Sequence, residues 1–393
     1  MKKSIFLIFL SLLVTTFSFS QNFTFNQGGT NQTNYYSVIP YENVNGKIIV
    51  EATINGKKHK FILDTGAPNI ISSSLFNELH PSILFKKSLR DANGVRDSMT
   101  VVETDSINFG GIYFKKIPTL VTTNDWITKC SNVDGFIGSN MLRNSIVRFS
   151  SADKTIILTD NKERLSLPEK ESSELFLVEN QSSPFIWIKL KNGKHKGNEQ
   201  VEFDSGDDAL YEFTLRHYAL FKKYKIFNVI TQTQGNHGAG LFGLGRDTTT
   251  YKLTLSEMNI GNAVLQNPVF ETTTDINSRM GTKLLDYGIV TIDYMNKKFY
   301  FEPFTETTNV YEKQLGISPT LKNNKLVVGI VWDENLKDSI HAGDEIISVD
   351  GKHFDENNFC NLITSSPFKN KDSVTLKIKD ASGRINEFIL TKK

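Results

Sequence analysis

The sequence predicts a mainly β protein in which one β unit occurs twice and a smaller third unit follows. Short segments with alternating apolar residues dominate, such as Ile48–Ile54, Lys60–Leu63 and Thr100–Phe109. Asn-Gly and Gly-Gly pairs separate many of them, and these pairs favour tight hairpin turns. Long stretches with a 3.6-residue apolar period are rare. We therefore expect a β-rich fold with few and short helices.

The composition fits a globular protein and argues against nucleic-acid binding. The 393 residues include 45 Lys and Arg against 43 Asp and Glu, so no basic excess is available to neutralise phosphates. The 28 Phe residues and an aromatic content of 11% supply ample core. The length predicts two or three domains, since a domain takes about 100–200 residues.

Residues 1–20 are typical of a secretory signal peptide. Lys2 and Lys3 precede the apolar run 5–17, and small residues at Ser18 and Ser20 favour cleavage before Gln21. A retained membrane anchor is the alternative. We expect secretion across the inner membrane to a periplasmic or extracellular location, with no integral membrane segment in the mature chain. Residues 21–40 form an N-terminal segment, and whether residues 22–41 act as an inhibitory pro-region stays open.

The two cysteines are expected to be free. Cys130 and Cys360 lie far apart along the chain, in different predicted units. Two cysteines cannot build a disulfide scaffold, so we predict two buried thiols rather than a bridge.

Two halves of the chain repeat the same landmarks in the same order. Asp64-Thr65-Gly66 corresponds to Asp204-Ser205-Gly206, and Ile137-Gly138 corresponds to Met280-Gly281. The stretch of chain from the first landmark to the second has nearly the same length in both halves. We therefore predict one lobe over residues 41–165 and a second over 175–305, followed by a polar linker.

The two Asp turns carry the chemistry that the sequence predicts. An Asp after a strand is commonly a turn former, but two such turns at matching places in a repeat favour a shared role. An approximate two-fold axis would bring Asp64 and Asp204 side by side. Two close carboxyls share one proton, because both cannot ionise cheaply. One can then activate a water while the other polarises the attacked carbonyl.

These motifs resemble those of aspartic proteases of the pepsin and retropepsin-like type, over about residues 40–305. The resemblance implies two pseudo-symmetric β-barrel lobes and hydrolysis of peptide bonds by Asp64 and Asp204, with no metal and no other cofactor. It also implies that Thr65, Gly66, Ser205 and Gly206 support the two loops. Peptides or unfolded proteins would be the substrates. In size the two lobes resemble retroviral subunits joined in one chain, so we expect a monomer.

The second half departs from the family pattern in three places. The strand before Asp204 reads Val201-Glu202-Phe203, which is less apolar than its counterpart before Asp64. Ala67 follows the first motif, whereas Asp207-Asp208 follows the second. Arg279 stands where the first half has Phe136. A degenerate second lobe in a non-catalytic peptide-binding envelope protein is therefore the alternative to an active enzyme.

The family covers its cleft with a mobile hairpin, and residues 91–96 are the candidate. Asn93 and Gly94 would form its tip, where glycine permits closure. No tyrosine occurs in residues 91–105, so the flap tyrosine of pepsin is missing, and an ordinary surface hairpin is the alternative.

Gly238–Gly243 matches the spacing of a dinucleotide-binding glycine motif, but no strand–helix–strand unit surrounds it. We interpret it as a loop of the second lobe. The scattered histidines form no metal-ligand pattern, and no Gly-x-Ser-x-Gly motif occurs.

Residues 315–393 resemble a PDZ domain of the kind attached to bacterial envelope proteases. The segment Gly343-Asp344-Glu345-Ile346 through Asp350-Gly351 carries the resemblance, together with predicted helices at 334–341 and 356–363. It implies a groove in which an extended peptide adds as a strand. Leu315, Gly316 and Ile317 would match the loop that receives a terminal carboxylate. Packing against the lobes without binding a ligand is the alternative.

Overall fold

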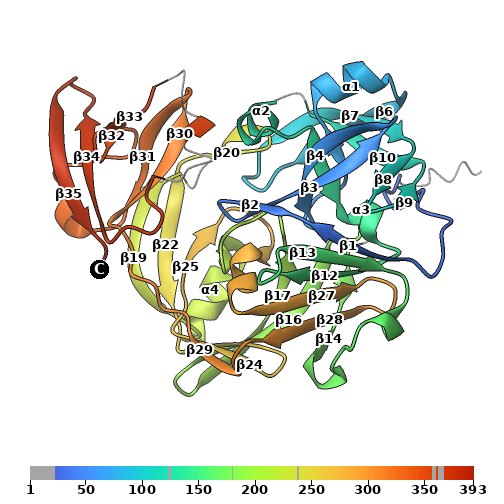
Figure 1. Cartoon of the computed structure of the whole chain (residues 1–393). Coiled ribbons are helices and arrows are strands. Elements are labelled where there is room, and N and C mark those ends of the chain that lie inside the picture. Colours follow the sequence, from blue (N-terminus) through green and yellow to red (C-terminus); the bar gives the residue numbers. More distant parts are fainter. Residues whose placement is uncertain (1–22, 123–124, 179, 237–238, 356–359, 362–366) are drawn as a thin grey trace, which may run out of the picture.

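The computed structural model describes residues 23–122, 125–178, 180–236, 239–355, 360–361 and 367–393. The predicted signal peptide and most of the predicted helix 356–363 lie outside these residues. Strands dominate the described chain, as predicted (Figure 1). None of the described helices combines the length and the apolar character that crossing a bilayer would require.

The first lobe is built on one curled sheet with the strand order β6-β7-β10-β5-β11-β4-β3-β8-β9, and β2 pairs with β3. Its strands are β2 (Glu42–Val44), β3 (Lys47–Ile54), β4 (Lys57–Asp64), β5 (Ile70–Ile71), β6 (Ser82–Arg90), β7 (Arg96–Thr104), β8 (Ile107–Phe109), β9 (Ile112–Phe114), β10 (Ile117–Val121) and β11 (Gly135–Gly138).

The second lobe repeats this order element by element, as β19-β22-β25-β18-β26-β17-β16-β23-β24, with β29 added at the edge. Its strands are β15 (Phe176–Leu177), β16 (Pro184–Asn192), β17 (His195–Phe203), β18 (Glu212–Thr214), β19 (Asn228–Gly235), β20 (Ala239–Gly240), β21 (Gly243–Leu244), β22 (Thr248–Thr254), β23 (Glu257–Ile260), β24 (Ala263–Gln266), β25 (Val269–Thr273), β26 (Ser278–Met280) and β29 (Thr307–Asn309). The repeated motifs of the sequence therefore correspond to a repeated topology.

A third sheet joins the two lobes. It has the order β1-β13-β12-β27-β28-β14, and its central pair, β12 and β27, comes from different lobes. Its strands are β1 (Tyr36–Pro40), β12 (Ile146–Ser150), β13 (Thr155–Thr159), β14 (Ser172–Glu174), β27 (Gly288–Asp293) and β28 (Lys298–Pro303). One continuous hydrophobic core runs through both lobes and this sheet. The lobes therefore form a single packed body.

Local sequence explains the hairpins and one error in our prediction. Asn55 and Gly56 both have positive φ, of 51° and 79°, which is the turn that an Asn-Gly pair favours between β3 and β4. We predicted one strand over Thr100–Phe109, but the chain breaks at Ser106, whose φ is 54°, so that β7 and β8 are separate strands.

Helices are short, as predicted, and several lie between strands of the lobes. Ser72 caps the first helix by accepting a hydrogen bond from the Leu75 amide. The helices are α1 (Ser73–Leu79), α2 (Trp126–Ser131), α3 (Ser139–Leu142) and α4 (Leu215–Lys223), with short 3₁₀ turns η1 (Lys162–Arg164), η2 (Glu169–Glu171), η3 (Thr282–Asp286) and η4 (Glu334–Leu336).

The C-terminal unit has its own sheet, ordered β30-β31-β32-β34-β35, and its own hydrophobic core. Its strands are β30 (Ile317–Lys322), β31 (Lys325–Val331), β32 (Glu345–Val349), β33 (Lys352–His353), β34 (Ser373–Lys379) and β35 (Ile385–Thr391). The helix predicted over 334–341 is wrong. Only the 3₁₀ turn η4 forms, because Asp333 caps a single turn at the Asn335 amide and the chain then enters the loop before β32.

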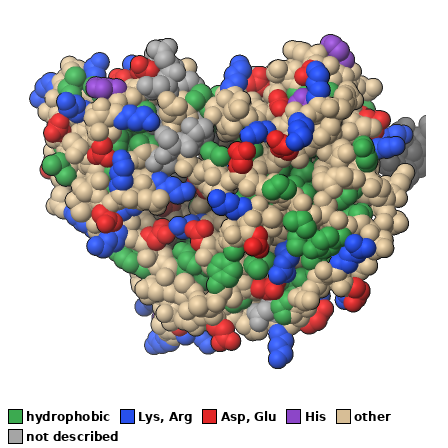
Figure 2. Space-filling view, in the orientation of Figure 1, with side chains coloured by type: hydrophobic (Ala, Val, Ile, Leu, Met, Phe, Trp, Pro, Cys, Tyr) green, Lys and Arg blue, Asp and Glu red, His purple; other side chains and the backbone are tan. Residues whose placement is uncertain are grey.

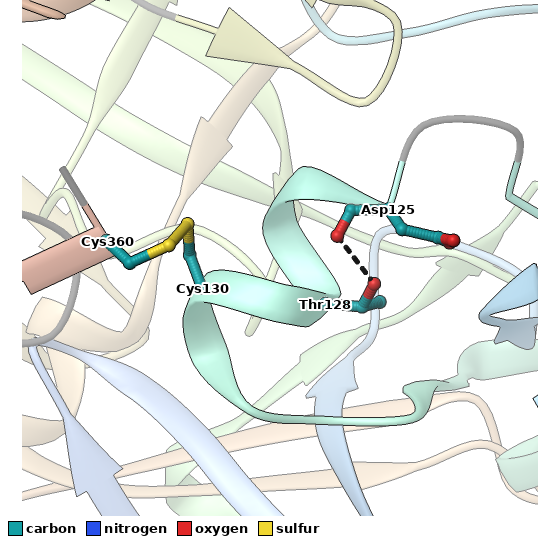
Figure 3. The surroundings of a disulfide bond; sticks show 4 residues. All are labelled: Asp125, Thr128, Cys130 and Cys360. Carbon is teal, nitrogen blue, oxygen red and sulfur yellow. Dashed lines mark hydrogen bonds between the residues drawn. A yellow bond between two sulfur atoms is a disulfide. The ribbon is translucent and has the colours of Figure 1, made fainter. Parts of the chain in front are cut away.

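The prediction of two free thiols is also wrong. Cys130 at the end of α2 and Cys360 in the C-terminal unit form a disulfide with Cα atoms 4.6 Å apart (Figure 3). The large sequence separation suggested two isolated cysteines, but the fold places the C-terminal unit against the first lobe and brings the two together. In the same helix, the Thr128 hydroxyl donates to the Asp125 carbonyl at 2.9 Å.

The C-terminal unit also packs on the second lobe, through β31 and β19. The backbone amide of Asn236 donates to the Gly329 carbonyl at 3.2 Å. The Lys252 ammonium lies 4.6 Å from the ring centre of Trp332. On the face shown in Figure 2, acidic and basic side chains are interspersed.

Candidate active site

The two Asp turns occupy equivalent places in the two lobes. Asp64 ends β4, and Asp204 follows β17 directly. A parallel strand lies beside each one, with Gly138 of β11 opposite Asp64 and Met280 of β26 opposite Phe203. A Cβ atom on Gly138 would lie 2.4 Å from the Ala67 carbonyl oxygen, so the chains pass too closely for any other residue. This explains the apolar-Gly motif that the sequence repeats.

The structure brings the two carboxyls together. A Cβ atom on Gly66 would lie 2.6 Å from Cγ of Asp204, and one on Gly206 would lie 2.5 Å from Cγ of Asp64. Each glycine thus makes room for the aspartate of the other lobe. The Gly66 amide donates to Asp64 at 3.0 Å, and the Gly206 amide donates to Asp204 at 2.8 Å. Asp64 and Asp204 therefore lie next to each other, each against the glycine of the other turn.

The hydroxyls next to the aspartates lock the two loops together. The Thr65 hydroxyl donates to the Phe203 carbonyl at 2.6 Å, and the Ser205 hydroxyl donates to the Leu63 carbonyl at 2.8 Å. Each hydroxyl also accepts the backbone amide of the other residue. Both side chains are fully buried. Any movement of one aspartate is therefore coupled to the other loop.

Burial and proximity make this pair hard to ionise. Burial raises the pKa of Asp64 well above its usual range, and the nearby charge of Asp204 raises it further. Burial also raises the pKa of Asp204, whereas the Arg279 guanidinium opposes that rise. Such a pair holds one proton at pH values where isolated carboxyls hold none, which is the state that acid–base hydrolysis requires.

Two side chains missed by the sequence analysis complete the loops. The Lys47 ammonium donates to the Gly206 carbonyl at 2.6 Å, and the Gln181 amide donates to the Gly66 carbonyl at 2.8 Å. Lys47 is the first residue of β3, and Gln181 lies in the turn before β16, so each reaches the Asp loop of the opposite lobe. Their positions in the sequence do not predict these contacts, because the contacts form only when the two lobes pack together.

Two hairpins meet at their tips. The candidate flap is the β6–β7 hairpin, whose turn holds Asn93 and Gly94. The Asp91 carboxylate accepts the Phe242 amide at 3.0 Å, and the Thr274 hydroxyl donates to the Asn93 carbonyl at 3.5 Å. Phe242 belongs to the β19–β22 hairpin of the second lobe. Residues 239–243 of the glycine-rich loop therefore lie at the tip of a second hairpin, and residue 238 lies outside the described residues.

A cavity of about 570 Å³ lies beside the second Asp loop. Residues Gly46, Asp208 and Glu212 of the lobes line it, together with Phe368 and Lys369 of the C-terminal unit. In the view of Figure 2, charged side chains surround a hollow between the C-terminal unit and the two lobes. The C-terminal unit thus borders the space next to the second Asp loop.

The predicted carboxylate-binding loop of the C-terminal unit lies within that unit. Ile317 is buried in its core, and Leu315 packs against the same core. The Gly316 carbonyl accepts the amides of Trp332 and Asp333. Leu315 and Gly316 precede β30, the edge strand of the sheet, and Ile317 is its first residue.

Comparison with known proteins gives a match in the first lobe. Residues 50–144 match a family model described as "gag-polyprotein putative aspartyl protease". This part of the chain, which holds Asp64, is therefore aspartyl protease-like. Among curated proteins, none matches the chain.

Proposed function

We propose that the protein is an aspartic endopeptidase in which Asp64 and Asp204 activate a water that attacks a peptide bond. The observation that carries this proposal is the pair of adjacent, partly buried carboxyls, whose loops are held by reciprocal hydroxyl contacts. A shared proton lets one carboxyl take a proton from water while the other gives one to the carbonyl oxygen. The match of residues 50–144 to an aspartyl protease family supports a hydrolase.

Both lobes belong to one chain, so a single copy supplies both aspartates. This supports a monomeric enzyme that takes peptides or unfolded proteins. The flap hairpins would close over such a substrate, with Asn93 and Gly94 at one tip. The Cys130–Cys360 disulfide supports export, because disulfides persist in oxidising compartments. Sequencing the N-terminus of the mature protein tests this export, and we expect Gln21 as the first residue.

We further propose that the C-terminal unit is a PDZ domain that positions substrates. The edge strand β30, which begins at Ile317, and the two residues before it support this role, since an extended peptide can add to an exposed sheet edge. Fluorescent peptides with a free C-terminus should bind, and the same peptides with an amidated C-terminus should bind at least tenfold more weakly. Equal binding of both would exclude carboxylate recognition.

A non-catalytic peptide-binding protein is the second candidate. It is favoured by Arg279, which lies 3.9 Å from Asp204 and could hold that carboxylate as a structural ion pair. One experiment distinguishes the two candidate functions. Purified mature protein should cleave an unfolded protein at acidic pH, and a statine-type peptide should inhibit it. Binding without any cleavage between pH 3 and pH 7 would favour the second candidate.

A further inference from the structure

The walls beside the two aspartates differ although the lobes correspond strand by strand. In the first lobe, Phe136 of β11 lies opposite Ile62 of β4. In the second lobe, Arg279 of β26 lies opposite Glu202 of β17. Ile62 and Glu202 stand at the same position relative to the nearby aspartate. A pair of ionisable residues therefore replaces an apolar pair on one side of the dyad only.

Arg279 is held in a fixed orientation beside Asp204. Its Nη1 atom lies 3.9 Å from Oδ2 of Asp204, and its Nε atom lies 3.0 Å from Oδ2 of Asp207. Its Nη2 atom lies 2.6 Å from Oε2 of Glu212. The side chain is only 12% exposed. Because a guanidinium is planar, carboxylates on several sides leave it little freedom to turn away.

Other charged groups also face Asp204, and they do not create the same asymmetry. The Lys47 charge lowers the pKa of both dyad aspartates, so it acts on the two carboxyls in the same direction. The Asp207 charge raises the pKa of Asp204 and opposes Arg279. The ionisable groups around Asp204 are Asp64 of β4, Lys47 of β3, Glu202 of β17, Asp207 of its own loop, Asp275 before β26 and Arg279 of β26.

We propose, on the basis of the aspartic endopeptidase function above, that Arg279 is a positioning residue that keeps Asp204 ionised and leaves the shared proton on Asp64. Asp204 then accepts a proton from the attacking water, whose oxygen bonds to the carbonyl carbon. Asp64 gives its proton to the carbonyl oxygen, so that a neutral tetrahedral diol forms. Afterwards Asp204 is protonated and Asp64 is ionised, and the number of protons and charges is unchanged.

Two substitutions should move the acidic limb of the pH profile in opposite directions. Activity requires ionised Asp204, so the midpoint of that limb follows its pKa. Arg279→Gln removes the nearby cation and should raise the midpoint by about one pH unit. Asp207→Asn removes a competing anion and should lower the midpoint, while Asn keeps an oxygen for the Ala209 amide. Arg279→Lys keeps the charge and should restore most of the wild-type midpoint.

A control separates this role from a structural one. Arg148→Gln also removes a buried guanidinium, one that pairs with Glu302 in the sheet between the lobes, and it should leave the midpoint unchanged. If Arg279→Gln and Asp207→Asn lower the rate but leave the midpoint in place, Arg279 is only structural and the proposal is wrong. Should Arg279→Gln fail to fold, the shift of Asp207→Asn alone decides.

The carboxyl titrations can be followed without turnover. In ¹³C NMR spectra of the wild-type protein, the Asp204 carboxyl should titrate at lower pH than that of Asp64, and Arg279→Gln should reduce the difference. The reverse order would overturn the proposal even if the protein is an active protease. Absence of any cleavage that depends on Asp64 and Asp204 would instead overturn the proposed function, while the NMR titration would still decide the charge assignment.

Discussion

Thr65 and Ser205 hydrogen-bond to each other's backbone across the boundary between the lobes. The Thr65 amide donates to the Ser205 hydroxyl and the Ser205 amide donates to the Thr65 hydroxyl, each at 3.0 Å. Both hydroxyls then donate to a strand carbonyl of the opposite lobe. These contacts fix the spacing of the adjacent aspartates, so the geometry of the dyad depends on two residues that do no chemistry themselves.

Thr65→Val should damage both stability and activity. Valine keeps the shape of threonine but leaves the Ser205 amide and the Phe203 carbonyl without their buried partner, at a cost of about 3 kcal/mol. Urea unfolding measures the free energy, and peptide cleavage measures the activity. Thr65→Ser keeps the hydroxyl and should lose much less. Equal losses in the two variants would mean that the hydroxyl contacts are unimportant.

Asp91→Ala should weaken substrate binding by opening the contact between the hairpin tips. The carboxylate accepts the Phe242 amide of the other lobe and also shapes its own turn through the Asn93 and Val95 amides. We expect kcat/KM to fall about tenfold, which corresponds to loss of a charge-assisted hydrogen bond. Asp97→Ala removes an exposed carboxylate of the same hairpin, one that accepts the neighbouring Ser98 amide, and should change little. Similar losses in both would contradict a specific role for the tips.

Asp64→Asn should make the protein more stable at neutral pH. Because the folded state raises the pKa of Asp64, the native protein holds a proton there that the unfolded chain has released. Stability therefore falls as the pH rises from about 4, the usual range of an unfolded Asp, through the higher folded pKa. The variant avoids this loss and should gain at least about 1 kcal/mol at pH 7. Thermal unfolding from pH 3 to pH 7 measures the gain, which should vanish at the acidic end. Parallel curves for the variant and the wild type would contradict the raised pKa.

Replacing both Cys130 and Cys360 by serine should loosen the C-terminal unit. The bond joins residues separated by 230 positions, a loop for which chain entropy sets an upper limit of about 5 kcal/mol. Trp332 is buried beside Lys252 at the contact with the second lobe, so its fluorescence reports release of the unit. In urea, release should precede unfolding of the lobes in the double variant and coincide with it in the oxidised wild type. An unchanged unfolding curve would show that the β19–β31 contact suffices.

The features that could be predicted from the sequence are those that depend on short local motifs, which occur in both halves of the chain. The Asp-Thr/Ser-Gly turns, the glycines that pass close to another chain segment and the Asn-Gly hairpins each require particular residues, and the repeat reveals them twice. The β class follows from alternating segments in the same way. The repeat also predicts that Asp64 and Asp204 lie side by side, and in the structure each aspartate lies against the glycine of the other turn.

The features that were missed depend on contacts between distant segments. The disulfide joins residues whose proximity only the packing of the third unit creates. Lys47 and Gln181 reach the Asp loops of the opposite lobe, so nothing near them in sequence marks their role. The sequence of the glycine-rich loop at 238–243 did not indicate that Phe242 contacts Asp91 of the flap hairpin. Arg279 departs from the pattern of the first half, but its contact with Asp204 depends on the register of β17 and β26.

Cleavage of an unfolded protein by single dyad variants tests the central claim most directly. Asp64→Asn and Asp204→Asn each prevent the pair from sharing a proton as two carboxyls, so each should reduce kcat/KM at least about a thousandfold. Asp105→Asn, in an exposed turn of the first lobe, is the matched control and should cleave like the wild type. Cleavage by either dyad variant at the rate of this control would contradict the account.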